Sequence, residues 1–212
     1  MAPDTPILLA TSNPAKLDKL RWVLEGLPLT CVPLAQFPDQ PQPEESGQTF
    51  EESARLKASQ GSTLFRGLAI ASDGGLGIPA LAGGEWEALL TARAAGEEAD
   101  DGARARHLLA LMQGKQGEQR RVFWTEALAL ADRGRLLGSW QETGGEGYLT
   151  ESYDPSEAIP GFWVYSLWHC PQFGKRYVEL TSQELAEVDV TWQRLKARVQ
   201  QWFYERDFLS RA

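Results

Sequence analysis

The first third of the chain alternates between short apolar runs and amphipathic stretches. Residues 7–10, 30–34 and 68–72 are short apolar runs, and each predicts a buried strand. Residues 16–27 and 50–64 place small or apolar side chains three and four positions apart, a spacing that predicts helices. This alternation of strand and helix favours a sheet with helices packed against it.

The pattern changes after residue 100. It predicts a helix over 101–112, a hairpin of strands over 121–132 and 136–142, a loop over 144–160, a strand over 162–168, and one or two helices over 183–208. Strands and helices therefore alternate early and strands gather later. We expect an α/β protein with a two-lobed, mixed, twisted sheet flanked by helices, forming a single domain over 1–212 without a separable linker.

Composition and charge narrow the class of protein. The chain has 212 residues and a formal net charge of -8, which argues against general binding to nucleic acid or to acidic membranes. No apolar run approaches the ~20 residues that span a bilayer. Cys31 and Cys170 form no CxxC motif, so we expect free thiols in a reducing, cytoplasmic protein.

The first candidate for chemistry is the turn between residues 7–10 and 16–27. Thr11, Ser12 or Asn13 can cap the helix, and Lys16 lies in its first turn. Backbone amides at a helix N-terminus together with one lysine make an anion site. The alternative is a capped helix with a solvated lysine.

The second candidate for chemistry is a set of carboxylates together with another lysine. Glu51, Glu52 and Lys57 lie on the second predicted helix, and Asp73 follows the strand over 68–72. Mg²⁺ needs only one or two protein carboxylates in addition to substrate phosphates. The alternatives are glutamates that favour the helix dipole and an Asp-Gly turn. With only two histidines, far apart, the chain offers no histidine-based zinc site or Ser-His-Asp triad.

Three segments, taken in this order, resemble the motifs of the inosine triphosphate pyrophosphatase (HAM1/RdgB-like) family. Residues 11–16 resemble its Thr-Gly-Asn-x-x-Lys motif. Residues 44–58, which begin Glu44-Glu45-Ser46, resemble its Glu-Glu-Thr-Gly-x-Thr-Phe motif and the residues that follow it. Residues 72–76 resemble Asp-Asp-Ser-Gly-Leu. Residues 91–96 resemble the Ser-Ala-Arg-Tyr-Ala-Gly segment of the family, and looser likenesses at 161–162 and 173–180 extend the resemblance over nearly the whole chain.

The resemblance implies an active cleft between two lobes, a homodimer, and hydrolysis of a nucleoside triphosphate to monophosphate and pyrophosphate with Mg²⁺. It also implies a role for each matching residue. The triphosphate would be bound by Thr11, Asn13, Lys16 and Lys57, the metal by Glu52 and Asp73, and the base by Phe162, Trp163 and Arg194, with Asp73 and Lys57 as the catalytic pair.

The departures from the family concentrate in its base-recognition motifs. Gly-Phe-Gly-Tyr-Asp becomes residues 161–165, without the aspartate, and Ser-His-Arg has no counterpart near residues 188–194. Losing hydrogen-bonding partners in a pocket changes specificity by orders of magnitude. We therefore expect an altered or relaxed base preference in the house-cleaning of non-standard nucleotides.

Two other hypotheses about the function remain open. The first is a catalytically silent member that binds a nucleotide or a protein, because the Trp-rich C-terminal half also suits an interaction surface. The second is hydrolysis of a different phosphoanhydride, which needs only the phosphate-binding half. Neither reading involves a nucleic acid polymer or a membrane.

Overall fold

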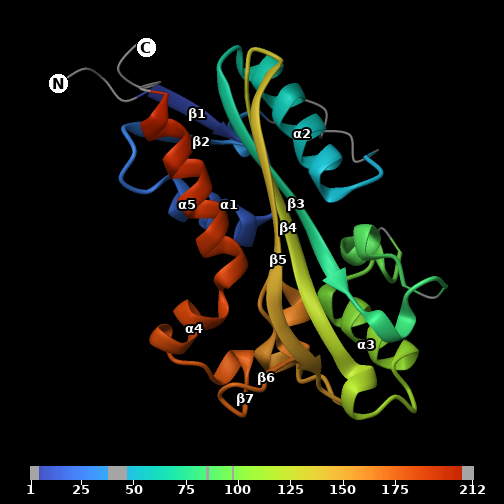
Figure 1. Ribbon diagram of the computed structural model, residues 1–212. Coiled ribbons are helices and arrows are strands. Elements are labelled where there is room, and N and C mark those ends of the chain that lie inside the picture. Colours follow the sequence, from blue (N-terminus) through green and yellow to red (C-terminus); the bar gives the residue numbers. More distant parts are fainter. Residues whose placement is uncertain (1–4, 38–46, 85, 97, 207–212) are drawn as a thin grey trace. The chain divides into compact units, whose positions relative to one another are not determined.

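The computed structural model describes residues 5–37, 47–84, 86–96 and 98–206 (Figure 1). The chain divides into two compact units, and it passes between them more than once. Unit 1 comprises residues 1–73, 126–142 and 192–212, and unit 2 comprises residues 74–125 and 143–191. Each unit is therefore assembled from separate stretches of sequence. The expectation of a single domain over 1–212 stays a prediction.

Within the described residues, seven strands form one mixed sheet in the order β2-β1-β3-β4-β5-β6-β7. Strand β1 pairs in parallel with β2 and β3, whereas β6 pairs antiparallel with β5 and β7. The bounds are β1 Thr5–Leu9, β2 Leu29–Pro33, β3 Leu68–Gly77, β4 Arg121–Asp132, β5 Arg135–Leu149, β6 Trp168–Cys170 and β7 Lys175–Arg176. The prediction of a mixed α/β sheet with flanking helices is confirmed.

Five α-helices accompany the sheet in the described part of the chain. They are α1 Pro14–Leu24, α2 Phe50–Phe65, α3 Asp101–Leu111, α4 Ser182–Val188 and α5 Val190–Glu205. Helices α1, α2 and α3 begin at Pro14, Phe50 and Asp101, directly after the capping residues Asn13, Thr49 and Asp100. The last residues of the predicted helix over 183–208, Asp207 and Phe208, lie outside the described residues.

In unit 1, helices lie on both faces of the sheet. Figure 1 shows α2 on one face and α1 and α5 on the other. Small side chains let α2 approach closely: a Cβ at Gly61 would come within 2.9 Å of the Cβ of Ala10. The α2 face is built from a cluster that includes Leu8, Ala10, Ala54, Ala58, Ala69, Ala71, Ala127, Ala129 and Ala131.

Unit 2 has an aromatic core around α3. Trp86 donates its indole N–H to the carbonyl of Leu76 at 2.7 Å, so this buried ring keeps its polar atom satisfied. Arg120 is also buried, and its guanidinium donates to the carbonyls of Leu149 and Met112. The arginine therefore joins the end of α3 to the end of β5.

Several predicted boundaries were wrong. Strand β5 continues to Leu149, through glycines that had been assigned to a loop, and residues Trp163–Leu167 form a 3-10 helix rather than a strand. The hairpin between β4 and β5 turns at Arg133 and Gly134, which have φ of 47° and 83°. Positive φ at both central residues gives a two-residue turn whose twist suits the hairpin.

No helix among the described residues is long and apolar enough to cross a membrane. Cys31 and Cys170 are both free thiols, as predicted, and they lie in different units.

Candidate active site

The strand order of unit 1 reverses direction next to β1. The chain runs from β1 through α1 to β2 and then through α2 to β3, and these two helices lie on opposite faces of the sheet. The sheet therefore has its topological switch point between β1 and β3, where open α/β sheets bind ligands at the carboxyl ends of the strands. The pairing of β1 with β3 ends at Leu9 and Ile70, and β3 continues beyond it.

The N-terminus of α1 lies at this switch point, shortly after the end of β1. Asn13 caps the helix, because its Oδ1 accepts a hydrogen bond from the amide of Lys16 at 3.1 Å. Thr11 accepts in turn from the amide of Asn13 at 3.2 Å. The amides of the first helical turn and the positive end of the helix dipole favour an anion. Thr11, Asn13 and Lys16, the residues predicted to bind phosphate, are thus gathered in one turn.

Lys57 comes from the middle of α2 and is 8% exposed. Its ammonium donates to Oδ1 of Asp73 at 2.9 Å. A lysine buried to this extent keeps its charge at low cost only beside an acceptor or an anion, and Asp73 supplies one. The structure therefore joins the two residues predicted to form the catalytic pair, which stand 16 positions apart in the sequence.

Asp73 lies inside β3 and not in a turn after it. The strand was expected to end at residue 72, but it continues through Gly74 and Gly75 to Gly77. These glycines keep the extended backbone, and a Cβ at Gly77 would lie 2.2 Å from the ring of Phe123. The alternative of an Asp-Gly turn is therefore wrong. Asp73 projects from a rigid strand, three residues beyond the last pairing with β1.

Glu52 lies in the first turn of α2 with an exposed side chain. Thr49 accepts from the amide of Glu52 at 3.1 Å, and Oε2 of Glu52 accepts from the amide of Gln48 at 2.9 Å. The two contacts resemble a capping box, except that the glutamate reaches the residue before the cap and not the cap itself. The first residues of the matching motif, Glu44, Glu45 and Ser46, lie outside the described residues.

Mg²⁺ at this site would take some of its oxygen ligands from the protein and the others from a substrate. Glu52 and Asp73 each use one carboxylate oxygen in a contact, and within the described ranges the second oxygen accepts no hydrogen bond. The described residues hold no group of three or more metal-ligating side chains. A site with two carboxylates fits the preference of Mg²⁺ for a few protein oxygens with phosphates and water completing the octahedron.

Sequence reasoning missed one charged residue of this region. Glu126 on β4 is fully buried, and its Oε1 lies 3.4 Å from the ammonium of Lys16. The signal in the sequence was an acidic residue at the start of the apolar run 127–131. A glutamate is almost never fully buried unless it is paired.

The aromatic residues predicted to bind a base lie in unit 2. Phe162 is half-buried, and its ring centroid lies 5.5 Å from that of Tyr165 and 6.5 Å from that of Trp124. Trp163 instead belongs to the hydrophobic core of unit 2 and is 4% exposed. The geometry therefore favours Phe162 over Trp163 as a stacking surface.

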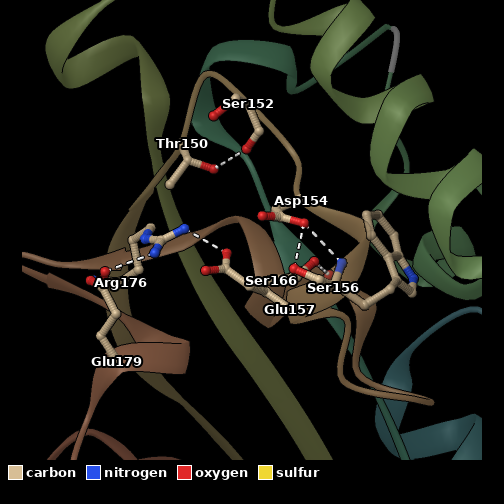
Figure 2. Close-up of polar contacts among 9 residues, drawn as sticks. Thr150, Ser152, Asp154, Ser156, Glu157, Ser166, Arg176 and Glu179 are labelled. Atoms are coloured by element: carbon tan, nitrogen blue, oxygen red, sulfur yellow. Dashed lines mark hydrogen bonds and ion pairs between the residues drawn. The ribbon is translucent and has the colours of Figure 1, made fainter.

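Polar contacts hold the segment that leads to Phe162 (Figure 2). Arg176 donates to Glu157 and to Glu179, which joins the 3-10 helix Pro155–Glu157 to the segment after β7. These hydrogen bonds keep the pKa of Arg176 above its ordinary value. Ser166 donates to the carbonyl of Trp163 and closes the following turn. The backbone on both sides of Phe162 is therefore fixed within unit 2.

Beside Phe162, unit 2 has a small aromatic hollow that opens to solvent and encloses about 20 Å³. Its walls include Trp124, Tyr165 and Tyr177, and the acidic residues Glu146 and Asp189 also line it. Burial and the nearby carboxylate of Asp189 raise the pKa of Tyr177, so its hydroxyl stays protonated. Arg194, the third predicted base contact, is an exposed residue of α5 in unit 1, and its role stays a prediction.

Comparisons with known proteins identify the family. The model of the Ham1 family matches residues 7–159. The chain belongs to the Ham1 family. It is 36% identical over 156 residues to a dITP/XTP pyrophosphatase of Geobacter sulfurreducens, a match that covers 68% of this chain and 77% of that protein. It is 31% identical over 196 residues to the dITP/XTP pyrophosphatase of Geobacillus kaustophilus, covering 92% and 93%.

Solved structures of Ham1 proteins share the fold. A HAM1 protein from Coxiella burnetii aligns with a TM-score of 0.74 and 25% identity over 93% of this chain and 99% of its own. A dITP/XTP pyrophosphatase from Mycobacterium abscessus aligns with a TM-score of 0.67 and 27% identity, covering 91% and 98%. The family and the fold class predicted from the motifs are both confirmed.

Proposed function

We propose that this Ham1 protein is a magnesium-dependent nucleoside triphosphate pyrophosphatase that removes non-standard nucleotides. The observation that carries the proposal is the pairing of Lys57 with Asp73 at the switch point where Lys16 and the amides of α1 form an anion site. The names of the relatives confirm the prediction of a hydrolase that acts on the phosphoanhydride bonds of triphosphates. The dependence on Mg²⁺ and the base preference belong to this proposal.

Some residues of unit 1 bind the triphosphate, and others take part in its hydrolysis. The α1 amides, Asn13 and Lys16 hold the triphosphate and balance its negative charge. Lys57 neutralises charge on the reacting phosphates and keeps Asp73 in place. Asp73 orients the attacking water and accepts its proton. The water oxygen bonds to the α-phosphorus, the bond to the bridging oxygen breaks, and pyrophosphate leaves.

Mg²⁺, when bound by Glu52, Asp73 and the phosphates, would supply a Lewis acid that neutralises the charge of the triphosphate. The described residues offer carboxylate oxygens and no cysteine or histidine at this site, which favours a hard cation such as Mg²⁺ over zinc.

For the base, we propose that Phe162 stacks against the ring and that the aromatic hollow of unit 2 replaces the polar groups absent from residues 161–165. Aromatic faces stack on any base, whereas hydrogen bonds discriminate between bases. A site built in this way has a relaxed or altered preference. The homodimer and the cytoplasmic location predicted from the sequence are also proposals, and light scattering of the purified protein tests the first.

The decisive experiment measures pyrophosphate release from a panel of triphosphates. The panel contains inosine, xanthosine, the standard ribo- and deoxyribonucleoside triphosphates, and modified pyrimidine nucleotides, each with Mg²⁺ and with chelator. We expect turnover of at least one member that is lost when Mg²⁺ is removed. Inorganic tripolyphosphate and nucleoside diphosphates, offered as substrates, test the hypothesis that the protein hydrolyses a different phosphoanhydride. Absence of turnover by the folded protein would instead support the catalytically silent regulator.

A further inference from the structure

The most unusual polar contact of unit 1 joins Lys16 to Glu126. The side chain of Glu126 is 0% exposed and that of Lys16 is 13% exposed, with 3.4 Å between Nζ and Oε1. Burying two charges costs more than their attraction returns unless the geometry is favourable. Well-packed apolar residues at these two positions would often stabilise the fold equally well, so stability alone does not explain this pair.

The location of Glu126 separates it from the carboxylates assigned to the metal. Ala127, Ala129 and Ala131 of β4 belong to the cluster that packs against α2. Because side chains alternate along a strand, Glu126 points to the opposite face, the one that α1 covers. Asp73 instead pairs with Lys57 of α2. Glu126 also belongs to no group of three metal-ligating side chains among the described residues.

Both lysines of the anion site are therefore already paired with a carboxylate. Lys57 is paired with Asp73 at 2.9 Å, and Lys16 is paired with Glu126 at 3.4 Å. Each lysine is thus offset by a carboxylate partner, and Glu52 adds a further carboxylate to the candidate site. A bare polyphosphate thus meets little net positive charge from these side chains, although the α1 amides still face it.

We propose that Glu126 is the internal counter-ion of Lys16 and holds the affinity of the site for bare polyphosphate low. The carboxylate draws the ammonium inward and opposes the charge of an incoming anion. Binding then depends on a divalent cation that arrives with the phosphates. The proposal rests on the proposed function for the identity of the nucleotide, whereas the effect of Glu126 on anion binding is measured without turnover.

The test is calorimetric titration of the full chain with inorganic tripolyphosphate in chelator. Glu126→Gln keeps the size and polarity of the side chain but removes its charge. Because a charge several ångströms from an anion in a partly buried site contributes strongly, we expect the variant to bind tripolyphosphate about tenfold more tightly. Glu126→Asp retains the charge, and we expect its affinity to stay within about twofold of the wild type.

Glu25→Gln is the matched control for net charge. Glu25 also pairs with a lysine of unit 1, Lys196 at 3.1 Å, but its side chain is 70% exposed. We expect this variant to bind tripolyphosphate as the wild type does. An affinity of Glu126→Gln within twofold of the wild type, or an equal gain in Glu25→Gln, would overturn the proposal.

A second measurement checks that the two residues are coupled. Lys16→Met takes away a partner of the buried Glu126, so we expect it to lower the melting temperature of the wild type more than that of Glu126→Gln. Equal losses in the two backgrounds would show that the pair is not coupled and would also overturn the proposal.

The experiments separate this proposal from the proposed function. If a nucleotide is turned over but Glu126→Gln does not change tripolyphosphate binding, the proposed pyrophosphatase activity is supported and the proposed role of Glu126 is wrong. If Glu126→Gln binds tripolyphosphate more tightly but no nucleotide is turned over, the proposed role of Glu126 is supported and the proposed pyrophosphatase activity is wrong.

Discussion

At the scale of single residues, Asp73 is the side chain on which the proposed chemistry depends most. It lies on a rigid strand, beyond the last pairing of β3 with β1, and Lys57 holds one of its two oxygens. A carboxylate in this position can orient water and contact a metal without any movement of the backbone. Its removal therefore affects the reaction more than the fold.

Asp73→Asn is expected to lower turnover by about a hundredfold or more, because an amide neither accepts a proton nor carries the negative charge that the reaction needs. The amide oxygen can still accept from Lys57, so the circular dichroism spectrum and nucleotide binding should stay close to those of the wild type. Asp132→Asn, at the far end of β4, is the matched control and should retain full turnover. Undiminished pyrophosphate release by Asp73→Asn would exclude the role assigned to this residue.

At the scale of elements, the beginning of α1 combines structure with function. Asn13 satisfies a helix amide and also stands in the turn assigned to the triphosphate. Asp100 caps α3 in the same way, accepting from the amide of Ala103 at 2.6 Å, but it belongs to unit 2, whereas the anion site is assigned to unit 1. The two caps can therefore be compared directly.

Asn13→Ala and Asp100→Ala should each lower the free energy of unfolding by about 1 kcal/mol, because each leaves a helix amide without its cap. Only Asn13→Ala should also raise the KM for the triphosphate. Denaturant unfolding and initial rates measure the two effects separately. An equal rise in KM in both variants would show that the effect of Asn13 comes from stability alone.

At the scale of the whole molecule, the candidate residues fall into two units. The phosphate and metal residues belong to unit 1, and the aromatic residues near Phe162 belong to unit 2. Each unit also contains one free cysteine. Cys31 is half-buried, whereas Cys170 is 1% exposed and burial raises its pKa to about 11. The two thiols therefore report on the two units separately.

Iodoacetamide should modify Cys31 of the native protein before Cys170 at pH 8, and it should modify both rapidly in urea. The reagent attacks the thiolate, and the pKa of Cys170 keeps that thiol protonated until the pH approaches about 11. The pKa of Cys31 is also raised by burial, so its modification should accelerate as the pH rises above 8. Mass spectrometry follows both sites, and equal rates in the native protein would contradict this placement of Cys170.

The starts of three helices and the positions of two strands could be predicted because their signals are local. The caps Asn13, Thr49 and Asp100 determine where three helices begin, and apolar runs determine β1 and β4. The glycines after Asp73 favour a turn in the sequence, but in the structure they lie inside β3. The 3-10 helix after Phe162 was missed because aromatic residues favour a strand and a packed turn alike.

The sequence by itself determined the family, the order of strands and helices through β5, and the residue types that suit a metal-bound polyphosphate. These follow from spacing and side-chain chemistry, which need no partner in space. Only the tertiary structure decided which charges meet: Lys57 with Asp73, and Lys16 with Glu126, a pair 110 positions apart (126 minus 16). Such pairs depend on how strands order themselves in the sheet and on which face each helix covers, and no local pattern encodes either.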